Sequence, residues 1–281
     1  MNNLIHMRDQ RFNPRPVSRP GWNGSGDVCG LSDLLQLMGA DTDADPGYGA
    51  VQMPVSLRLL HAGDTLFHEG SRCEAIHFVR AGTFKSLRTA EDGYEQVLGF
   101  AGRAEVLGFD AFDSGFHPNG AVALEDSSVY FVLLGDFCGF GQHAPAFDRL
   151  VHRAVSAALA RRGELADVMA AVAAEVRLAR FLLQLSQRMA ACGQSPRRFH
   201  LRMSRRDIAS YLGVAHETVS RSFGALVGWR LVSVDNREVE ILDMPGLKAF
   251  ALNTRRHVDD DSHPSGAGLA AVRTGVEQRV A

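Results

Sequence analysis

Three polar residues near position 220 have the types and the spacing of a group that reads the edges of DNA bases. Glu217, Ser220 and Arg221 stand at positions i, i+3 and i+4, so on an α-helix they share one face. Arginine can donate two hydrogen bonds to guanine, glutamate can accept one from cytosine, and serine can serve several bases. The alternative is an ordinary surface Glu–Arg pair, worth about 0.3 kcal/mol to the helix. The flanking sequence favours the first interpretation.

The residues around this triplet predict two short helices joined by a tight turn. Ser204 and Asp207 match a helix-capping box, with Asp in the place usually taken by Glu or Gln. The inner face of the first helix is predicted to be Ile208, Ala209 and Leu212. Gly213 supplies the permissive backbone of the turn. The buried face of the second helix is predicted to be Val219, Phe223 and Leu226. This is the pattern of a helix-turn-helix, whose second helix enters the major groove.

Basic residues surround the predicted helix-turn-helix. Between Gln194 and Arg230, seven arginines stand against only Asp207 and Glu217, in a chain of formal net charge −2. The arginines are Arg197, Arg198, Arg202, Arg205, Arg206, Arg221 and Arg230. Such a local excess is typical of a surface that faces phosphates, although a solvated basic face has the same composition. We expect Arg205 and Arg206 to contact the DNA backbone and Thr218 to lie at the same interface.

Two short strands are predicted directly after the second helix. Residues 231–234 and 239–242 are apolar-rich runs on either side of a polar turn at Asp235 and Asn236. They would form the wing of a winged helix-turn-helix, which commonly touches the DNA backbone.

The bulk composition leaves room for a second domain. The chain has 281 residues, 46% of them apolar and 22% charged, as in ordinary globular proteins. No apolar run approaches the roughly 20 residues that span a bilayer, and residues 1–20 lack the apolar core of a signal peptide. We therefore expect a cytoplasmic protein without membrane contact. Its four cysteines show no CxxC pair, so a disulfide framework is not expected.

Patterning divides the chain into five segments and indicates an α+β fold. Strand-sized apolar runs, separated by turn residues, predict a compact antiparallel barrel or roll in the second segment. These runs are residues 75–79, 83–87, 96–100 and 129–134. The segments are a largely disordered arm with a short helix at 31–38 (1–50), the roll (51–144), a long helix (145–175), the winged helix-turn-helix (176–254) and a disordered tail (255–281).

The long helix carries an apolar stripe at near-heptad spacing. The stripe is Phe147, Val151, Ala154, Ala158, Leu165, Met169, Val172 and Val176. A helix of this kind can bury the stripe against a symmetry mate, which predicts a dimerisation helix. The alternative is that the stripe packs on the protein's own roll.

These motifs together resemble the CRP/FNR superfamily of bacterial regulators, and in particular its FNR branch. The resemblance covers roughly residues 55–250, and its motifs lie at 63–67, 80–86, 108–111, 114–118, 195–199 and 217–221. It implies a β-roll sensor domain of the cyclic-nucleotide-binding jelly-roll type, a dimerisation helix and a winged helix-turn-helix. It also implies a homodimeric transcription regulator rather than an enzyme, and a palindromic operator of the TTGAT-N4-ATCAA type. The loop at 114–120 resembles a region that contacts RNA polymerase, which favours activation.

Two departures from the family bear on cofactors. Nucleotide-binding members carry an arginine for the phosphate where this chain reads Pro118-Asn119-Gly120-Ala121-Val122, which predicts that no nucleotide binds. FNR holds an iron–sulfur cluster with four cysteines, of which only Cys29 has a counterpart here. The next family cysteine falls on Leu35 and the cysteine of the roll on Tyr130. Because such a cluster generally needs four thiolates, we expect no cluster, no metal and no other cofactor.

The remaining residues bear on two alternative functions. Haem or small-molecule sensing would use His61, His68 or His77, which lie on or near predicted strands. A cupin-like metalloenzyme joined to a DNA-binding module would need paired His and Glu ligands on one strand pair, and that signature is absent from the sequence. Cys73, Cys138 and Cys192 have no counterpart among the cluster ligands, and we interpret all four cysteines as packing or incidental thiols. The alternative is a single redox-reactive cysteine.

Overall fold

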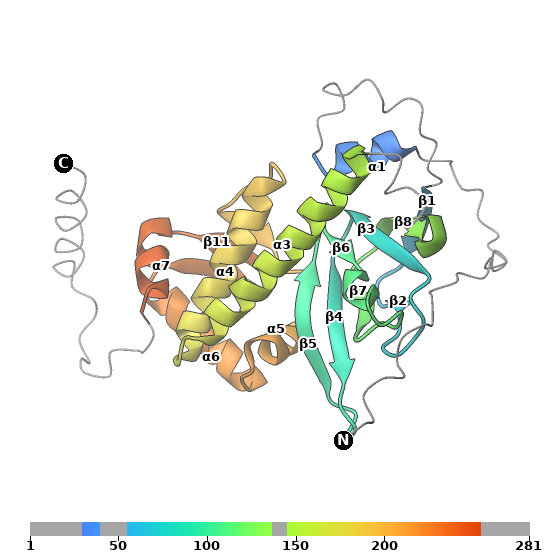
Figure 1. The fold of residues 1–281 in the computed structure, drawn as a ribbon. Coiled ribbons are helices and arrows are strands. Elements are labelled where there is room, and N and C mark those ends of the chain that lie inside the picture. Colours follow the sequence, from blue (N-terminus) through green and yellow to red (C-terminus); the bar gives the residue numbers. More distant parts are fainter. Residues whose placement is uncertain (1–29, 40–54, 137–144, 254–281) are drawn as a thin grey trace, which may run out of the picture. The chain divides into compact units, whose positions relative to one another are not determined.

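A computed structural model of the chain describes residues 30–39, 55–136 and 145–253, with side chains 145–148 left out (Figure 1). The chain divides into two compact units, and the boundary between them in the sequence falls between Arg161 and Arg162, inside helix α3 (Pro145–Met169). The predicted tail at 255–281 lies outside the described residues, as does the predicted arm apart from residues 30–39. No helix of the described part is long and apolar enough to cross a membrane.

The first unit contains two four-stranded antiparallel sheets, which confirms the predicted roll. The first sheet has the order β1 (Ser56–Leu60), β8 (Ser127–Leu133), β3 (Ala75–Ala81) and β6 (Val106–Leu107). The second has the order β2 (Thr65–Phe67), β7 (Gly120–Ala123), β4 (Phe84–Thr89) and β5 (Glu95–Ala101). A short 3₁₀ helix, η2 (Phe109–Ala111), follows β6. All four predicted apolar runs lie within or overlap these strands.

The strands of the first sheet are apolar on both faces, and each face belongs to a different core. Val79 and Val129 pack in one cluster with Phe84 of the second sheet. Ile76 and Phe78 belong to another cluster, together with helix α1 (Leu31–Leu37) and the early part of α3. The predicted helix near 31–38 is thus confirmed, and it covers the roll.

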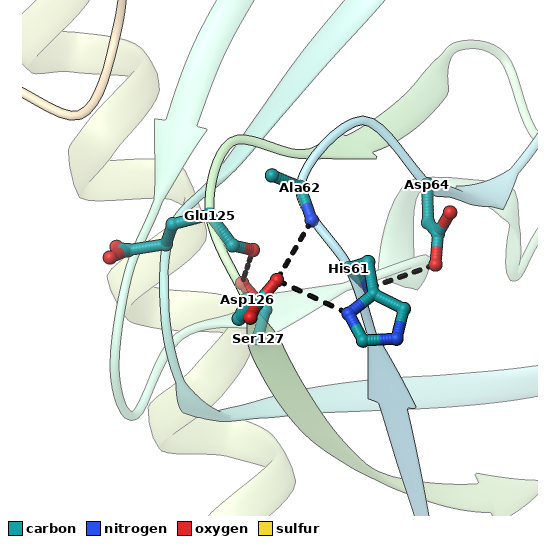
Figure 2. Close-up of polar contacts among 6 residues, drawn as sticks. All are labelled: His61, Ala62, Asp64, Glu125, Asp126 and Ser127. Atoms are coloured by element: carbon teal, nitrogen blue, oxygen red, sulfur yellow. Dashed lines mark hydrogen bonds and ion pairs between the residues drawn. The ribbon is translucent and has the colours of Figure 1, made fainter.

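Two tight turns of the roll are joined by the side-chain carboxylate of Asp126 (Figure 2). The Asp126 carboxylate accepts a hydrogen bond from the Ala62 amide at 3.2 Å and lies 3.3 Å from His61 Nδ1. Asp64 accepts from the amide of His61 at 2.8 Å. The turn between β1 and β2 is therefore tied to the turn before β8.

Helix α3 carries the predicted apolar stripe only as far as Met169, because Val172 and Val176 lie beyond its end. Ala154 is buried in the core of the roll and Val151 is packed against it, so this end of the stripe follows the alternative interpretation. Val155 and Leu159, on another face of the helix, are 39% and 63% exposed. The prediction that the whole stripe forms a dimer seam is therefore wrong for Val151 and Ala154, because the core of the roll already covers them.

The second unit contains the predicted winged helix-turn-helix. Its elements are α4 (Ala174–Ala191), β9 (Arg198–His200), α5 (Arg205–Leu212), α6 (His216–Gly228), β10 (Val232–Asp235), β11 (Glu238–Ile241) and α7 (Met244–Ala251). Strands β10 and β11 pair antiparallel as predicted, with Val234 opposite Val239. The sequence did not predict β9, which pairs with β11 and completes a three-stranded sheet.

Candidate nucleic-acid interface

Helix α5 begins at the predicted capping box. Ser204 Oγ accepts a hydrogen bond from the Asp207 amide at 3.1 Å, and Asp207 Oδ2 accepts one from the Ser204 amide at 2.9 Å. Two backbone N–H groups that the first turn would leave without partners are thereby satisfied. The cap fixes where the helix-turn-helix starts.

The turn between the two helices also forms as predicted. Gly213 has φ +63°, a left-handed conformation that side chains disfavour. Arg177 of α4 supports the turn, since its Nη1 donates to the Leu212 carbonyl at 2.9 Å and its Nε donates to the Ala171 carbonyl at 2.8 Å. The end of α5 is thus held by backbone geometry and by a partly buried arginine side chain.

The two helices bury the faces that their periodicity predicted. The buried side chains are Ile208, Ala209 and Leu212 of α5 and Val219, Phe223 and Leu226 of α6. None of these is more than 4% exposed. Burial of this face determines which side of α6 remains in water.

The side of α6 that remains in water carries the triplet. Glu217, Ser220 and Arg221 are all exposed. Arg221 Nη2 donates to Thr218 Oγ1 at 3.2 Å, and Ser220 Oγ lies 3.4 Å from the His216 carbonyl oxygen. A guanidinium has five N–H donors, so Arg221 can still donate hydrogen bonds to a base edge after this one local bond. The structure places three adjacent polar groups on the first two turns of the helix.

The two arginines at the start of α5 lie in different environments. Arg206 is exposed, whereas Arg205 is partly buried with its guanidinium carbon 3.5 Å from the centre of the Phe223 ring. Arg205 Nη2 also donates to the Asn236 carbonyl in the wing turn at 3.1 Å. Burial lowers the pKa of Arg205 from its ordinary value. The guanidinium of Arg205 is therefore engaged by contacts within its own unit. Its position in the sequence did not predict these contacts.

Cross-strand pairs reduce the positive charge of the wing sheet. Arg198 of β9 lies 2.7 Å from Glu240 of β11, and this hydrogen bond raises the pKa of the arginine. His200 lies 2.5 Å from Glu238 on the same two strands. Both carboxylates lie outside the arginine-rich stretch 194–230. The composition of that stretch therefore overstates the positive charge of this surface. Arg237, exposed in the wing turn, is a cation that the sequence analysis missed because it lies beyond that stretch.

Comparison with known proteins agrees with this architecture. Residues 57–142 match the family model of the cyclic nucleotide-binding domain, and residues 176–250 match that of the Crp-like helix-turn-helix domain. The transcriptional regulatory protein btr of Bordetella pertussis is 38% identical over 186 residues, which span 66% of this chain and 77% of btr. The fumarate and nitrate reduction regulatory protein of Escherichia coli is 36% identical over 199 residues, 70% of this chain and 78% of that protein.

A solved structure shares the fold. FixK2 from Bradyrhizobium japonicum superposes with a TM-score of 0.64 at 23% identity, covering 72% of this chain and 99% of FixK2. The chain belongs to the CRP/FNR family of DNA-binding transcription regulators. Its relatives are regulators and not enzymes, in agreement with the sequence analysis.

The residues of the roll do not fit the phosphate of a cyclic nucleotide. In the stretch 118–122, the Asn119 amide donates to the Asp110 carboxylate, and the Pro118 carbonyl accepts from Arg88 Nη2 at 3.3 Å. Arg88 Nε also lies 3.6 Å from Glu69. A phosphate here would face the carboxylates of Asp110 and Glu69, and the Arg88 guanidinium is already paired with Glu69.

The described residues do not fit an iron–sulfur cluster either. Leu35 and Tyr130, at the positions of two family cysteines, lie in the same apolar cluster and are 0% and 8% exposed. The Cys73 thiol is buried, and this burial raises its pKa to about 11, the opposite of what a thiolate ligand needs. Cys192 is exposed, whereas Cys29 and Cys138 lie outside the described residues.

The three histidines considered as haem or metal ligands lie in different environments. His61 and His68 are exposed, and His61 is bonded to Asp126. His77 is buried beside Phe67, with 5.7 Å between the ring centres. Within the described residues, no three His, Cys, Asp or Glu side chains are grouped so that they could hold a metal ion.

Proposed function

We propose that this protein binds, as a homodimer, a palindromic operator of the TTGAT-N4-ATCAA type. The observation that carries the proposal is the exposed triplet Glu217, Ser220 and Arg221, held at the start of α6 by the cap and the glycine turn. In this position the side chains can reach base edges while α6 lies in the major groove. Thr218 supports Arg221, and exposed arginines such as Arg206 supply contacts to the backbone.

Two further features support a dimer and a role in activation. Val155 and Leu159 expose apolar surface on α3, which a second copy of the helix would cover. Phe116 is 55% exposed in the loop at 114–120, whose sequence resembles a polymerase-contacting region, and Phe112 just before this loop is 46% exposed. We therefore include RNA polymerase among the proposed partners.

We also propose that the protein regulates transcription without an iron–sulfur cluster or a cyclic nucleotide. Leu35 and Tyr130 pack in one core, where apolar contact between α1 and the roll takes the place of ligation. Because that contact does not depend on oxidation, DNA affinity should be the same with and without oxygen.

Binding and sedimentation with a duplex that carries the palindrome test the first proposal. We expect two protomers per duplex and much weaker binding to a scrambled duplex of the same composition. A monomer on the operator, or equal affinity for both duplexes, would contradict the proposal.

Anaerobic purification tests the second proposal. The protein should be colourless, and Cys29→Ser should leave dimerisation and DNA affinity unchanged. Stoichiometric iron and sulfide, lost on exposure to air together with DNA binding, would overturn it.

The competing function is a haem- or small-molecule sensor, favoured by the buried imidazoles of His77 and His117, whose Nδ1 atoms have no partner in the described part of the chain. An absorption spectrum and metal analysis of the freshly purified protein separate the two.

A further inference from the structure

The first part of helix α3 is held by the roll. Leu150 and Ala154 are buried in the core of the roll. Further along the helix, Arg161 Nη1 lies 3.6 Å from Glu105 Oε1, and both side chains are largely shielded from water. The Glu105 carboxylate also accepts a hydrogen bond from the Gly102 amide at 3.0 Å, so it is itself fixed. The roll therefore holds α3 up to Arg161.

The end of α3 is held by helix α4 instead. The Glu164 carbonyl accepts a hydrogen bond from Gln184 Nε2 at 2.9 Å, and the Glu164 carboxylate lies 3.4 Å from Arg188 Nη2. One turn later, the Asp167 carbonyl accepts a hydrogen bond from Arg180 of the same helix α4. From Glu164 onward, α3 therefore belongs to the second unit.

The turn between α3 and α4 is held as well, although the helix is interrupted there. Arg177 Nε donates to the Ala171 carbonyl at 2.8 Å, and its Nη1 donates to the Leu212 carbonyl at the end of α5 at 2.9 Å. Ala171 is 1% exposed. Arg180 Nε donates to the Ala251 carbonyl of α7 at 2.8 Å. Because arginines of α4 join the ends of α3, α5 and α7, the turn is fixed within the second unit.

Arg162 and Gly163 stand between these two sets of contacts. Both are exposed, and the Arg162 side chain has no hydrogen bond or ion pair with another described residue. A Cβ added at Gly163 would meet nothing within 4 Å, so packing does not require a glycine there. Glycine weakens a helix interior, because it loses more conformational freedom on folding than any other residue. A weak point of α3 therefore lies between the parts that the two units hold.

We propose that α3 bends at Arg162–Gly163, and that the second unit turns about this point as one body with the end of α3 and the α3–α4 turn. Val155 and Leu159 lie before the bend, so a dimer contact through them stays in place while α6 moves. The consequence for DNA rests on the proposed function. Each protomer can adjust the position of α6 to the distance between the two half-sites.

Hydrogen exchange of the free protein tests the position of the bend without DNA. The amides of 164–167 donate to carbonyls 160–163 across the bend, so they should be less protected than the amides of Ala170 and Ala171, which donate to Ala166 and Val168. Gly163→Ala should raise protection at 164–167 about five-fold, because alanine is the better helix former. Lower protection at Ala170 and Ala171 than at 164–167 would place the hinge in the turn and overturn the inference.

Operators with a spacer of three, four or five base pairs test the consequence for DNA. Gly163→Ala should bind the operator with four base pairs as tightly as the wild type does. On the other two operators it should lose about five-fold more affinity than the wild type, the factor by which alanine stiffens this position. If the wild type does not prefer the palindrome to a scrambled duplex, the proposed function fails, whereas the exchange result is independent of DNA. If it does, and Gly163→Ala tolerates the altered spacers equally well, the bend is wrongly assigned.

A variant that moves the glycine is the matched control. Gly163→Ala/Ala166→Gly keeps the composition of α3 but places the glycine in the part that α4 holds, at a position that is also exposed. It should respond to the altered spacers as Gly163→Ala does, because the contacts of α4 prevent bending there. A response equal to that of the wild type would show that the position of the glycine does not matter, and would contradict a bend at Gly163.

Discussion

Two groups of polar side chains, one in each unit, lie in opposite environments. In the roll, His77 and His117 are 8% and 3% exposed, and their Nδ1 atoms find no partner in the described part of the chain. In the second unit, Arg206, Arg221 and Arg237 stand in water. A buried imidazole without a partner favours the neutral form, whereas an exposed guanidinium keeps its charge for a ligand. The buried imidazoles thus belong to the interior of the roll, whereas the exposed guanidinium groups of the second unit are available to an anionic surface.

The largest loss of stability should come from the substitution of Gly82, a glycine of the roll. Gly82 has φ +92°, and an added Cβ would lie 2.8 Å from Ser127 Cα and closer still to the Ser127 side chain. Gly82→Ala should therefore destabilise the roll by about 3 kcal/mol or more, since strain and a backbone clash add. Denaturant unfolding measures the loss.

Gly213→Ala provides the matched comparison in the second unit. Its added Cβ would lie 3.1 Å from the end of the flexible Met169 side chain and 3.8 Å from Arg177 Nη1, which is an ordinary contact. The cost should be about 1–2 kcal/mol, from the left-handed backbone alone. Equal losses of stability in Gly82→Ala and Gly213→Ala would contradict the expected difference between the two units.

Acid should weaken the roll through His77. Burial, followed by the charges of Arg58 and His117, lowers the pKa of His77 to about 3. The unfolded state, with an ordinary pKa near 6.5, binds the proton first, so stability is complete above pH 6.5 and falls toward pH 3. From pH 6.5 to 5 the loss should approach about 2 kcal/mol.

Hydrogen exchange of the amides in β3 and β8 measures this loss of stability in the roll. His77→Phe should remove most of the pH dependence, because a phenyl ring does not titrate. An unaltered pH profile in this variant would assign the acid sensitivity to other groups.

Base recognition should depend on Arg221 more than on its neighbours. Arg221→Ala should cost about 1–3 kcal/mol on the operator and relax discrimination at one guanine in each half-site. Affinity for non-specific DNA should change far less. Competition binding with single-base operator variants measures both, and Arg206→Ala, which should weaken all duplexes alike, is the control. An equal loss on both kinds of DNA in Arg221→Ala would contradict base reading.

The smallest effect should come from the cap of α5. Ser204→Ala removes the acceptor for the Asp207 amide and should destabilise the second unit by about 1 kcal/mol. Trp229, at the end of α6, provides a fluorescence signal for this unit. Ser204→Asp should restore most of the stability, because aspartate caps helices equally well. A loss in Ser204→Asp as large as that in Ser204→Ala would show that capping is not the cause.

The helix-turn-helix could be predicted from the sequence because its determinants are local. A cap and its partner are three residues apart, the turn glycine is one residue, and each helix face repeats every three or four residues. The strands of the roll could be predicted for the same reason, from short apolar runs and turns. Exposure of Glu217, Ser220 and Arg221 then follows from the burial of Val219 and Phe223 on the opposite face.

Tertiary structure decided everything that depends on partners far along the chain. Arg205 and Arg206 are adjacent, yet only packing against Phe223 and Asn236 turns one inward and leaves the other in water. Leu35 and Tyr130 are 95 positions apart in the sequence, and only the docking of α1 on the first sheet brings them into one core. Periodicity reports which face of a helix is apolar. It does not report which apolar surface covers that face, since many surfaces satisfy the same pattern.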